Sequence, residues 1–128
     1  MPILIEVAPG ELIDKLTILE IKQANIADPA KRRNIDHEYA VLQQALAQSV
    51  PPVPGLDALT AALKAVNQEL WRIEDEIRDH ERAGDFGAGF IALARAVYHT
   101  NDRRAALKRR INELLDSPIL EEKSYAAY

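Results

Sequence analysis

Acidic side chains crowd one short stretch of the sequence. Four carboxylates fall within two helical turns, at Glu74, Asp75, Glu76 and Asp79. Residues three and four apart share one face of a helix, and carboxylate oxygens are ligands that Mg²⁺ prefers. Arginines alternate with these acids, at Arg72, Arg78 and Arg82. Mixed charges of this kind are typical of a solvated, ion-paired helix face, which is the favoured interpretation, with a magnesium site as the alternative.

Basic side chains form a second cluster, near the end of the sequence. Five of them lie between positions 103 and 110, at Arg103, Arg104, Lys108, Arg109 and Arg110. The whole chain is nevertheless acidic, with 16 Lys and Arg against 20 Asp and Glu and a net charge of −4. Nucleic-acid-binding domains are typically basic and often carry aromatic platforms, so we expect no nucleic-acid partner. A phosphate site at Arg104 and Lys108 is a further hypothesis.

Residue types also exclude several kinds of chemistry. The chain has no cysteine, which rules out disulfides, cysteine-zinc sites and thiol nucleophiles and favours a reducing, cytoplasmic compartment. Its histidines, at positions 37, 80 and 99, lack the paired spacing of metal ligands. No apolar run approaches the ~18 residues of a membrane span, and the first residues lack the basic segment of a signal peptide. We therefore expect a cytoplasmic protein with no membrane partner.

The spacing of apolar residues predicts an all-α domain that positions these side chains. With 128 residues, 48% of them hydrophobic, the chain is long enough for a single domain over residues 1–128. The predicted segments are a short strand or extended arm over residues 1–8, a helix pair over 11–49, a long helical hairpin over 56–115 and a tail over 117–128. The first helix is expected to begin at Glu11 and to run to about Ala27. Asp28 and Pro29 are typical of the start of the second.

The stretch from 56 to 115 has the clearest helical periodicity. Steps of three and four residues separate the apolar positions of a heptad seam from Leu56 to Ile77, and a glycine-rich segment near residue 85 interrupts it. A second seam runs from Phe90 to Leu114. Because the connection between them is short, the two helices should fold back on each other as an antiparallel hairpin. We thus expect a four-helix arrangement dominated by this hairpin.

Two positions of the second seam, Thr100 and Arg104, are polar, and Asn101 lies beside them. In the predicted hairpin these residues face the stretch from Val66 to Leu70. A polar layer inside an apolar seam costs stability unless its groups find partners. It can fix the register of the helices, which is the favoured explanation, or it can line a polar groove for a ligand.

The segment from Pro9 to Lys22 reads PGELIDKLTILEIK. It resembles the signature of an uncharacterised bacterial family of small helical proteins, a domain of unknown function. Further matching segments are Trp71–Arg78, Ala94–Asp102 and Glu121–Tyr125. The resemblance covers almost the whole chain. It implies a bacterial protein with a link to surface polysaccharide synthesis, and it assigns no catalytic residue.

Polar residues of the matching segments, together with Arg104 of the seam, form a candidate functional cluster. Its members are Glu11, Asp14, Lys15, Glu74, Asp75, Arg78, Asn101 and Arg104. The cluster is expected to be either an ion-pair network between helices or a ligand site. In the second case Asp14, Glu74 and Asp75 are the alternative Mg²⁺ ligands.

The sequence favours a non-enzymatic module, without a cofactor, that forms a homo-oligomer (a homodimer) or binds a protein partner. Three observations support it: the long heptad seams, the apolar residues around the first helix, and the lack of a recognisable catalytic constellation. An unpaired N-terminal arm can add to the backbone of a partner or of a second copy. The alternative is a Mg-dependent enzyme or binder that acts on a phosphorylated metabolite such as a nucleotide or nucleotide-sugar.

Overall fold

The computed structural model describes residues 1–128 and contains four α-helices and no strand. The helices are α1 (Pro9–Asn25), α2 (Pro29–Ser49), α3 (Leu56–Ala83) and α4 (Ala88–Leu114). The predicted all-α fold with four helices is confirmed. The strand that sequence alternation allowed in residues 1–8 does not form.

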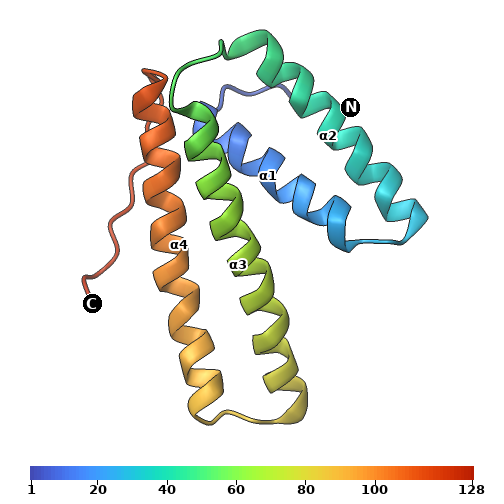
Figure 1. The fold of residues 1–128 in the computed structure, drawn as a ribbon, viewed down its shortest axis with the longest axis vertical. Helices are drawn as coiled ribbons and strands as arrows, with labels where there is room; N and C mark the ends of the chain where they lie inside the picture. The colour runs from blue at the N-terminus through green and yellow to red at the C-terminus, as the bar shows by residue number, and fades with distance from the viewer.

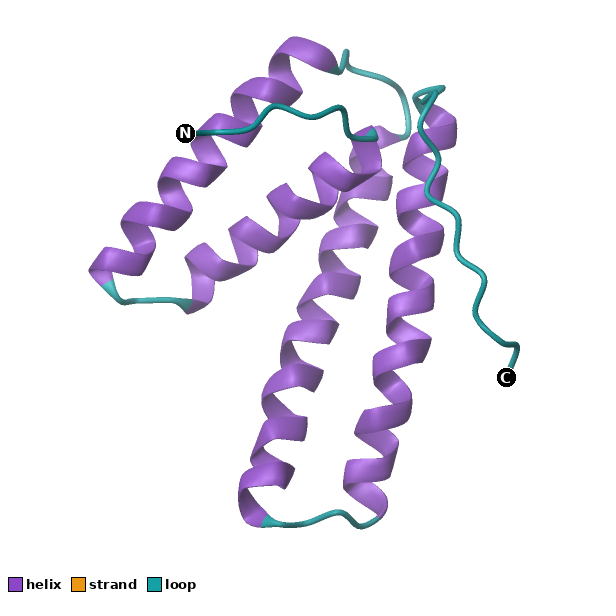
Figure 2. Ribbon diagram, turned by 180° about the vertical axis from the view of Figure 1, so that it is seen from behind, coloured by secondary structure: helices purple, strands orange, loops and turns teal.

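The helices are arranged as two pairs that meet at an angle. In both ribbon views α3 and α4 lie side by side, and residues 84–87 join them at one end of the molecule (Figure 1, Figure 2). α1 packs against both of these helices, whereas α2 packs along α1 alone. The joined half of the α3–α4 pair therefore extends beyond the α1–α2 pair, as Figure 1 shows.

A proline and a glycine open α1, which begins two residues earlier than predicted. Pro9 fits the first turn, because the N–H that proline lacks has no helical partner there. Gly10 follows where α1 meets α4 most closely, since an added Cβ would lie 2.6 Å from the carbonyl oxygen of Lys108. The Gly10 N–H donates to Oδ1 of Asn112 at 2.7 Å. Gly10, predicted to precede the helix, is thus part of α1 and a contact point between α1 and α4.

The start of α2 agrees with its sequence signal. The Asp28 carboxylate accepts a hydrogen bond from the backbone N–H of Lys31 at 3.0 Å, and Pro29 occupies the first turn. Asp28 therefore caps a free N–H group at the start of the helix. α1 ends at Asn25, two residues before the predicted end.

The small core is centred on α1. Of the 17 buried residues in the chain, eight lie on this helix. The innermost apolar contact joins Ile13 of α1 to Leu63 of α3 and Ile111 of α4, and none of the three exposes more than 2% of its surface. A helix buried on most of its circumference needs neighbours on several sides, and α2, α3 and α4 provide them.

The two ends of the chain lie outside this core. Residues 1–8, the arm, form neither helix nor strand. Within the arm, Ile3, Leu4 and Ile5 expose 85%, 96% and 75% of their surface. The tail after α4 runs back along that helix (Figure 2), where the hydroxyl of Tyr128 donates to Asp102.

Candidate functional site

A buried ion pair joins α1 to α4. The Asp14 side chain is only 1% exposed and lies against the guanidinium of Arg104. Nε of Arg104 donates to Oδ1 of Asp14 at 2.9 Å, and Nη2 donates to Oδ2. This two-point contact matches the planar guanidinium to the planar carboxylate. The polar position in the seam of α4 thus has its partner on α1, outside the α3–α4 pair.

Two uncharged side chains complete what we call the buried layer: Asp14, Thr17, Asn67 and Arg104. Nδ2 of Asn67, on α3, donates to Oδ1 of Asp14 and to Oγ1 of Thr17, in both cases at 2.9 Å. The Thr17 hydroxyl donates in turn to the backbone carbonyl of Asp14 at 2.8 Å. No buried side-chain nitrogen or oxygen of this layer lacks a partner, so its burial carries no unsatisfied polar group.

Asp14 remains ionised in spite of its burial. Burial raises the pKa of its carboxyl, but hydrogen bonds from Arg104 and Asn67 and the charges of Arg104 and Lys108 outweigh that effect and lower the pKa below 3.8. The hydrogen bond to Asp14 raises the pKa of Arg104 in return. Both groups are therefore charged near neutral pH, and neither is poised to exchange a proton.

A second charged contact between α1 and α4 lies one turn further along. Nζ of Lys108 lies 2.7 Å from Oε2 of Glu11 and 3.3 Å from Oε2 of Glu121 in the tail. Burial lowers the pKa of Lys108, but its hydrogen bond to Glu11 and the neighbouring carboxylates raise it by more. The Lys108 side chain is only 13% exposed. This cation, like Arg104, is thus neutralised by carboxylates of its own chain.

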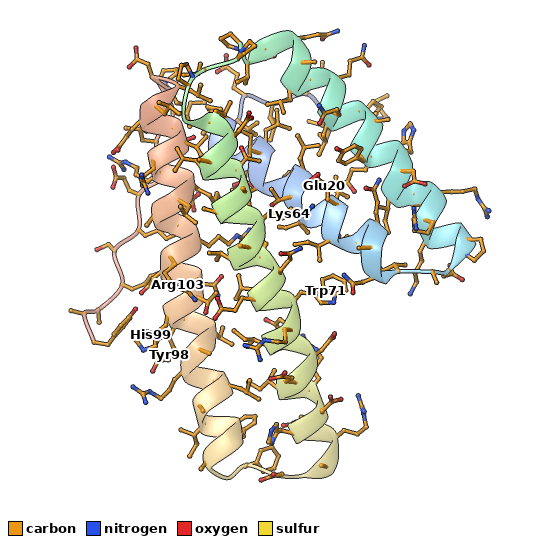
Figure 3. The ribbon with its side chains drawn as sticks, in the orientation of Figure 1. Glu20, Lys64, Trp71, Tyr98, His99 and Arg103 are labelled. Carbon is orange, nitrogen blue, oxygen red and sulfur yellow. The ribbon has the colours of Figure 1, made fainter.

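An open groove of about 440 Å³ adjoins the buried layer and is formed by three helices. Its lining residues are Ile18, Ile21, Asn67, Leu70, Trp71, Glu74, Asp75, Arg78, Asn101 and Arg104. Figure 3 shows Trp71 between α3 and the end of α1. We refer to this surface as the groove. Asn67 and Arg104 belong both to it and to the buried layer.

Several polar groups in the groove have no partner within the protein. Side chains without a hydrogen bond or ion pair are those of Trp71, Asp75 and Asn101. Nη1 of Arg104 is also free, because Asp14 takes only Nε and Nη2. Arg78 and Glu74 pair with each other along α3. The groove therefore offers unused donors and acceptors, and its one unpaired charge is the negative Asp75.

Five of the eight candidate residues reach the groove: Glu74, Asp75, Arg78, Asn101 and Arg104. Asp14 lies behind Arg104 in the buried layer. Glu11 pairs with Lys108, and Lys15 is exposed and forms no ion pair. The candidate cluster is thus divided between a groove and a network of contacts between helices.

The carboxylates proposed as alternative Mg²⁺ ligands do not converge. No three histidine, aspartate or glutamate side chains lie together so that they could hold a metal ion. Asp14 is bound by Arg104 and Glu74 by Arg78, whereas Asp75 lines the groove without an ion pair.

The candidate cluster omits Trp71, which lines the groove, and Asn67, which belongs to the groove and the buried layer. It also omits Asn112, which accepts a hydrogen bond from the Gly10 N–H between α1 and α4. Asn67 lies next to the seam residue Val66, so its position beside a predicted polar layer is the signal that could have identified it. For Trp71 the signal was its place next to the seam residue Leu70. Asn112 has no comparable signal, because its role depends on the close approach of α1.

A protein-family model matches residues 3–128 of the chain. The chain belongs to the family of unknown function DUF6165. The predicted resemblance to an uncharacterised family is thereby confirmed. Comparisons of this DUF6165 chain with curated proteins and with solved structures give no match. None of its four helices combines the length and the hydropathy that crossing a membrane requires.

Proposed function

We propose that this chain is a non-enzymatic, homodimeric module that binds a partner through its exposed apolar segments and its groove. The observation that carries the proposal is the extent of its surface. The chain exposes 8789 Å². A folded monomer of 14.3 kDa typically exposes about 6,800 Å². The excess, about 2,000 Å², is larger than the ~800 Å² that each partner buries in a standard protein–protein interface.

Large apolar side chains contribute to this exposed surface at two places. In the arm these are Ile3, Leu4 and Ile5. At the joined end of the α3–α4 pair, Phe86 and Ile91 expose 54% and 55% of their surface. Exposed apolar residues that lie close together mark surfaces that another molecule covers. Such residues support a partner-binding role for both segments.

The charges of the site favour this module over a binder of a phosphorylated metabolite. Arg104 and Lys108, the cations considered for a phosphate, already contact the carboxylates of Asp14 and Glu11. A phosphate would compete with these internal partners and would meet the unpaired negative charge of Asp75. The same contacts argue against a Mg-dependent reaction, because Asp14 is already bound by a guanidinium.

The proposed setting is the cytoplasm of a bacterium, in a process connected with surface polysaccharide synthesis. The absence of cysteine supports a reducing compartment. The bacterial origin and the connection to polysaccharides rest on the family resemblance of the segment from Pro9 to Lys22.

Light scattering coupled to gel filtration tests the homodimer. At about 100 µM we expect a particle of twice 14.3 kDa, and on dilution this mass should fall towards that of one chain, as mass action requires. A particle that keeps the mass of a single chain at the higher concentration contradicts the proposal.

A further inference from the structure

The arm has unused binding groups over residues 1–7. No backbone N–H or C=O of residues 1–7 forms a hydrogen bond, and the chain contains no strand with which the arm could pair. Side chains of an extended segment alternate, so Ile3, Ile5 and Val7 share one side. These three residues expose 85%, 75% and 43% of their surface. The arm therefore presents an apolar edge and a free backbone.

The groove has the complementary features. Its apolar lining comes from Ile18, Ile21 and Leu70. The carboxamide of Asn101 holds both a donor and an acceptor, so it can bind the C=O and the N–H of an extended backbone. The Asp75 carboxylate can accept a further N–H. An extended segment with apolar side chains on one side could pack these side chains against the apolar lining. Its unpaired backbone could bond to Asn101 and Asp75.

We infer that the arm of one copy lies in the groove of a second copy. Ile3, Ile5 and Val7 then contact the apolar lining, and the backbone of the arm bonds to Asn101 and Asp75. In Figure 2 the arm runs across the α1–α2 pair. No residue of the arm lines the groove of its own chain. This inference rests on the proposed homodimer and names the surfaces that form it.

Reciprocal exchange fits both the length of the arm and the exposed area. Seven extended residues span about 23 Å, so the arm can reach well beyond the start of α1. In a two-fold dimer the same contact is made twice, because each copy gives an arm and receives one. The two exposed arms and the two open grooves are then covered by the same contact, which accounts for part of the excess surface of the chain.

Two neighbouring arm positions provide a matched test in the full chain. Ile5→Asp and Leu4→Asp add the same charge at residues that are 75% and 96% exposed, so neither substitution should affect folding. We expect Ile5→Asp to weaken dimerisation by about tenfold or more in analytical ultracentrifugation, because it brings a carboxylate into the apolar lining. Leu4→Asp should weaken it by less than about threefold, because Leu4 points away from that lining.

Equal effects of the two substitutions, or no effect of Ile5→Asp, overturn the inference. In that case a wild-type dimer still supports the proposed function, with an interface elsewhere. A wild-type chain that stays monomeric overturns both proposals.

Trp71 gives an independent readout, because it is the only tryptophan and lines the groove. A synthetic peptide of residues 1–8, added to the Ile5→Asp protein, should bind saturably and shift the Trp71 emission to shorter wavelength. The same peptide with Ile5→Asp should cause no shift. The native peptide should bind at least about fivefold more weakly to an Asn101→Asp protein, which loses the side-chain N–H that donates to the peptide backbone. A native peptide that leaves the emission unchanged overturns the inference.

Discussion

Arg104 faces two environments. Its Nε and Nη2 donate to Asp14 of α1, whereas its Nη1 has no partner within the protein, and the residue also lines the groove. The guanidinium can do this because its donors lie in one plane and point in different directions. A lysine at this position would present a single ammonium and could not keep the two-point contact.

Removing the charge of Asp14 should destabilise the fold strongly. In Asp14→Asn the Arg104 guanidinium loses its carboxylate. Breaking a buried ion pair in this way should lower the free energy of unfolding by roughly 3 kcal/mol. A larger loss is not expected, because part of Arg104 still contacts water. Urea unfolding gives the loss directly. As a matched control, Asp79→Asn removes one partner of the exposed pair with Arg82 and should cost less than about 1 kcal/mol. Similar losses in the two variants would mean that the buried pair is not a stabilising contact.

The same pair should make stability depend on pH in the acid range. The folded-state pKa of Asp14 lies below its ordinary value of 3.8. The contribution of the pair is therefore complete above pH 3.8 and is lost as the pH falls from there through the folded-state pKa. The difference in unfolding free energy between wild type and Asp14→Asn should be constant from pH 7 to about 5 and should narrow below 3.8. A constant difference down to pH 2 would contradict the pKa shift.

At the scale of helices, the contact of α1 with α4 depends on a missing side chain. A Cβ at position 10 would lie 2.6 Å from the Lys108 carbonyl oxygen and 2.7 Å from Oδ1 of Asn112. Gly10→Ala should therefore destabilise the protein by about 1–3 kcal/mol in thermal or urea unfolding, although alanine is the better helix former. The control is Gly89→Ala, where the added Cβ would meet only the ring of His80. Its effect should be within about 1 kcal/mol of zero, and a larger loss there than at Gly10 would contradict this reasoning.

α2 should be the least stable helix. It packs along α1 alone, and Ile35 is its only buried residue. Helices with few buried contacts open at a lower free-energy cost than the rest of a fold. Hydrogen exchange followed by mass spectrometry should show the amides of residues 31–48 exchanging well before those near Ile13 and Leu63. Equal protection of α1 and α2 would contradict this expectation.

The elements of the fold were largely predictable because they depend on local signals. The capping aspartate Asp28 marked the start of α2, and glycines near residue 85 marked the end of α3. The early start of α1 was not predictable in this way. Gly10 lies in the first turn of α1, where α4 leaves no room for a Cβ, and that close approach is a property of the tertiary structure.

The sequence indicated which residues form the candidate site, but not which of them contact each other. The polar residue Arg104 in an apolar seam correctly indicated a polar layer inside the bundle. Its partner Asp14 lies 90 positions earlier in the chain, and no local pattern specifies which carboxylate it meets. For the same reason the sequence did not separate Asp75, which lines the groove, from Glu11, which pairs with Lys108.

At the scale of the whole molecule, two helix pairs that meet at an angle leave much of the chain exposed. Only 17 of its 128 residues are buried. Such a shape fits the proposed binding module, because protein recognition needs exposed surface.

Ligand screening provides a test at this scale. We expect nucleotides and nucleotide-sugars, with Mg²⁺ present, to raise the melting temperature by less than about 1 °C, because only molecules that bind the folded state stabilise it. The cations of the site are already paired, so these anions have little to bind. Differential scanning fluorimetry measures the shift, with the peptide of residues 1–8 as the positive comparison. A rise of several degrees with one nucleotide would favour the phosphorylated-metabolite alternative.

Because Arg104 borders both the groove and the buried layer, recognition and folding share one side chain. A ligand group that accepts a hydrogen bond from Nη1 limits the motion of the Arg104 guanidinium. It therefore favours the orientation in which Nε and Nη2 donate to Asp14. Coupling between two sites is reciprocal, so weakening the contact between Asp14 and Arg104 must then lower the affinity of the groove for its ligand. This holds although Asp14 is only 1% exposed and does not contact that ligand. Substitutions deep in this bundle are therefore expected to change its affinity for a neighbour as well as its resistance to unfolding.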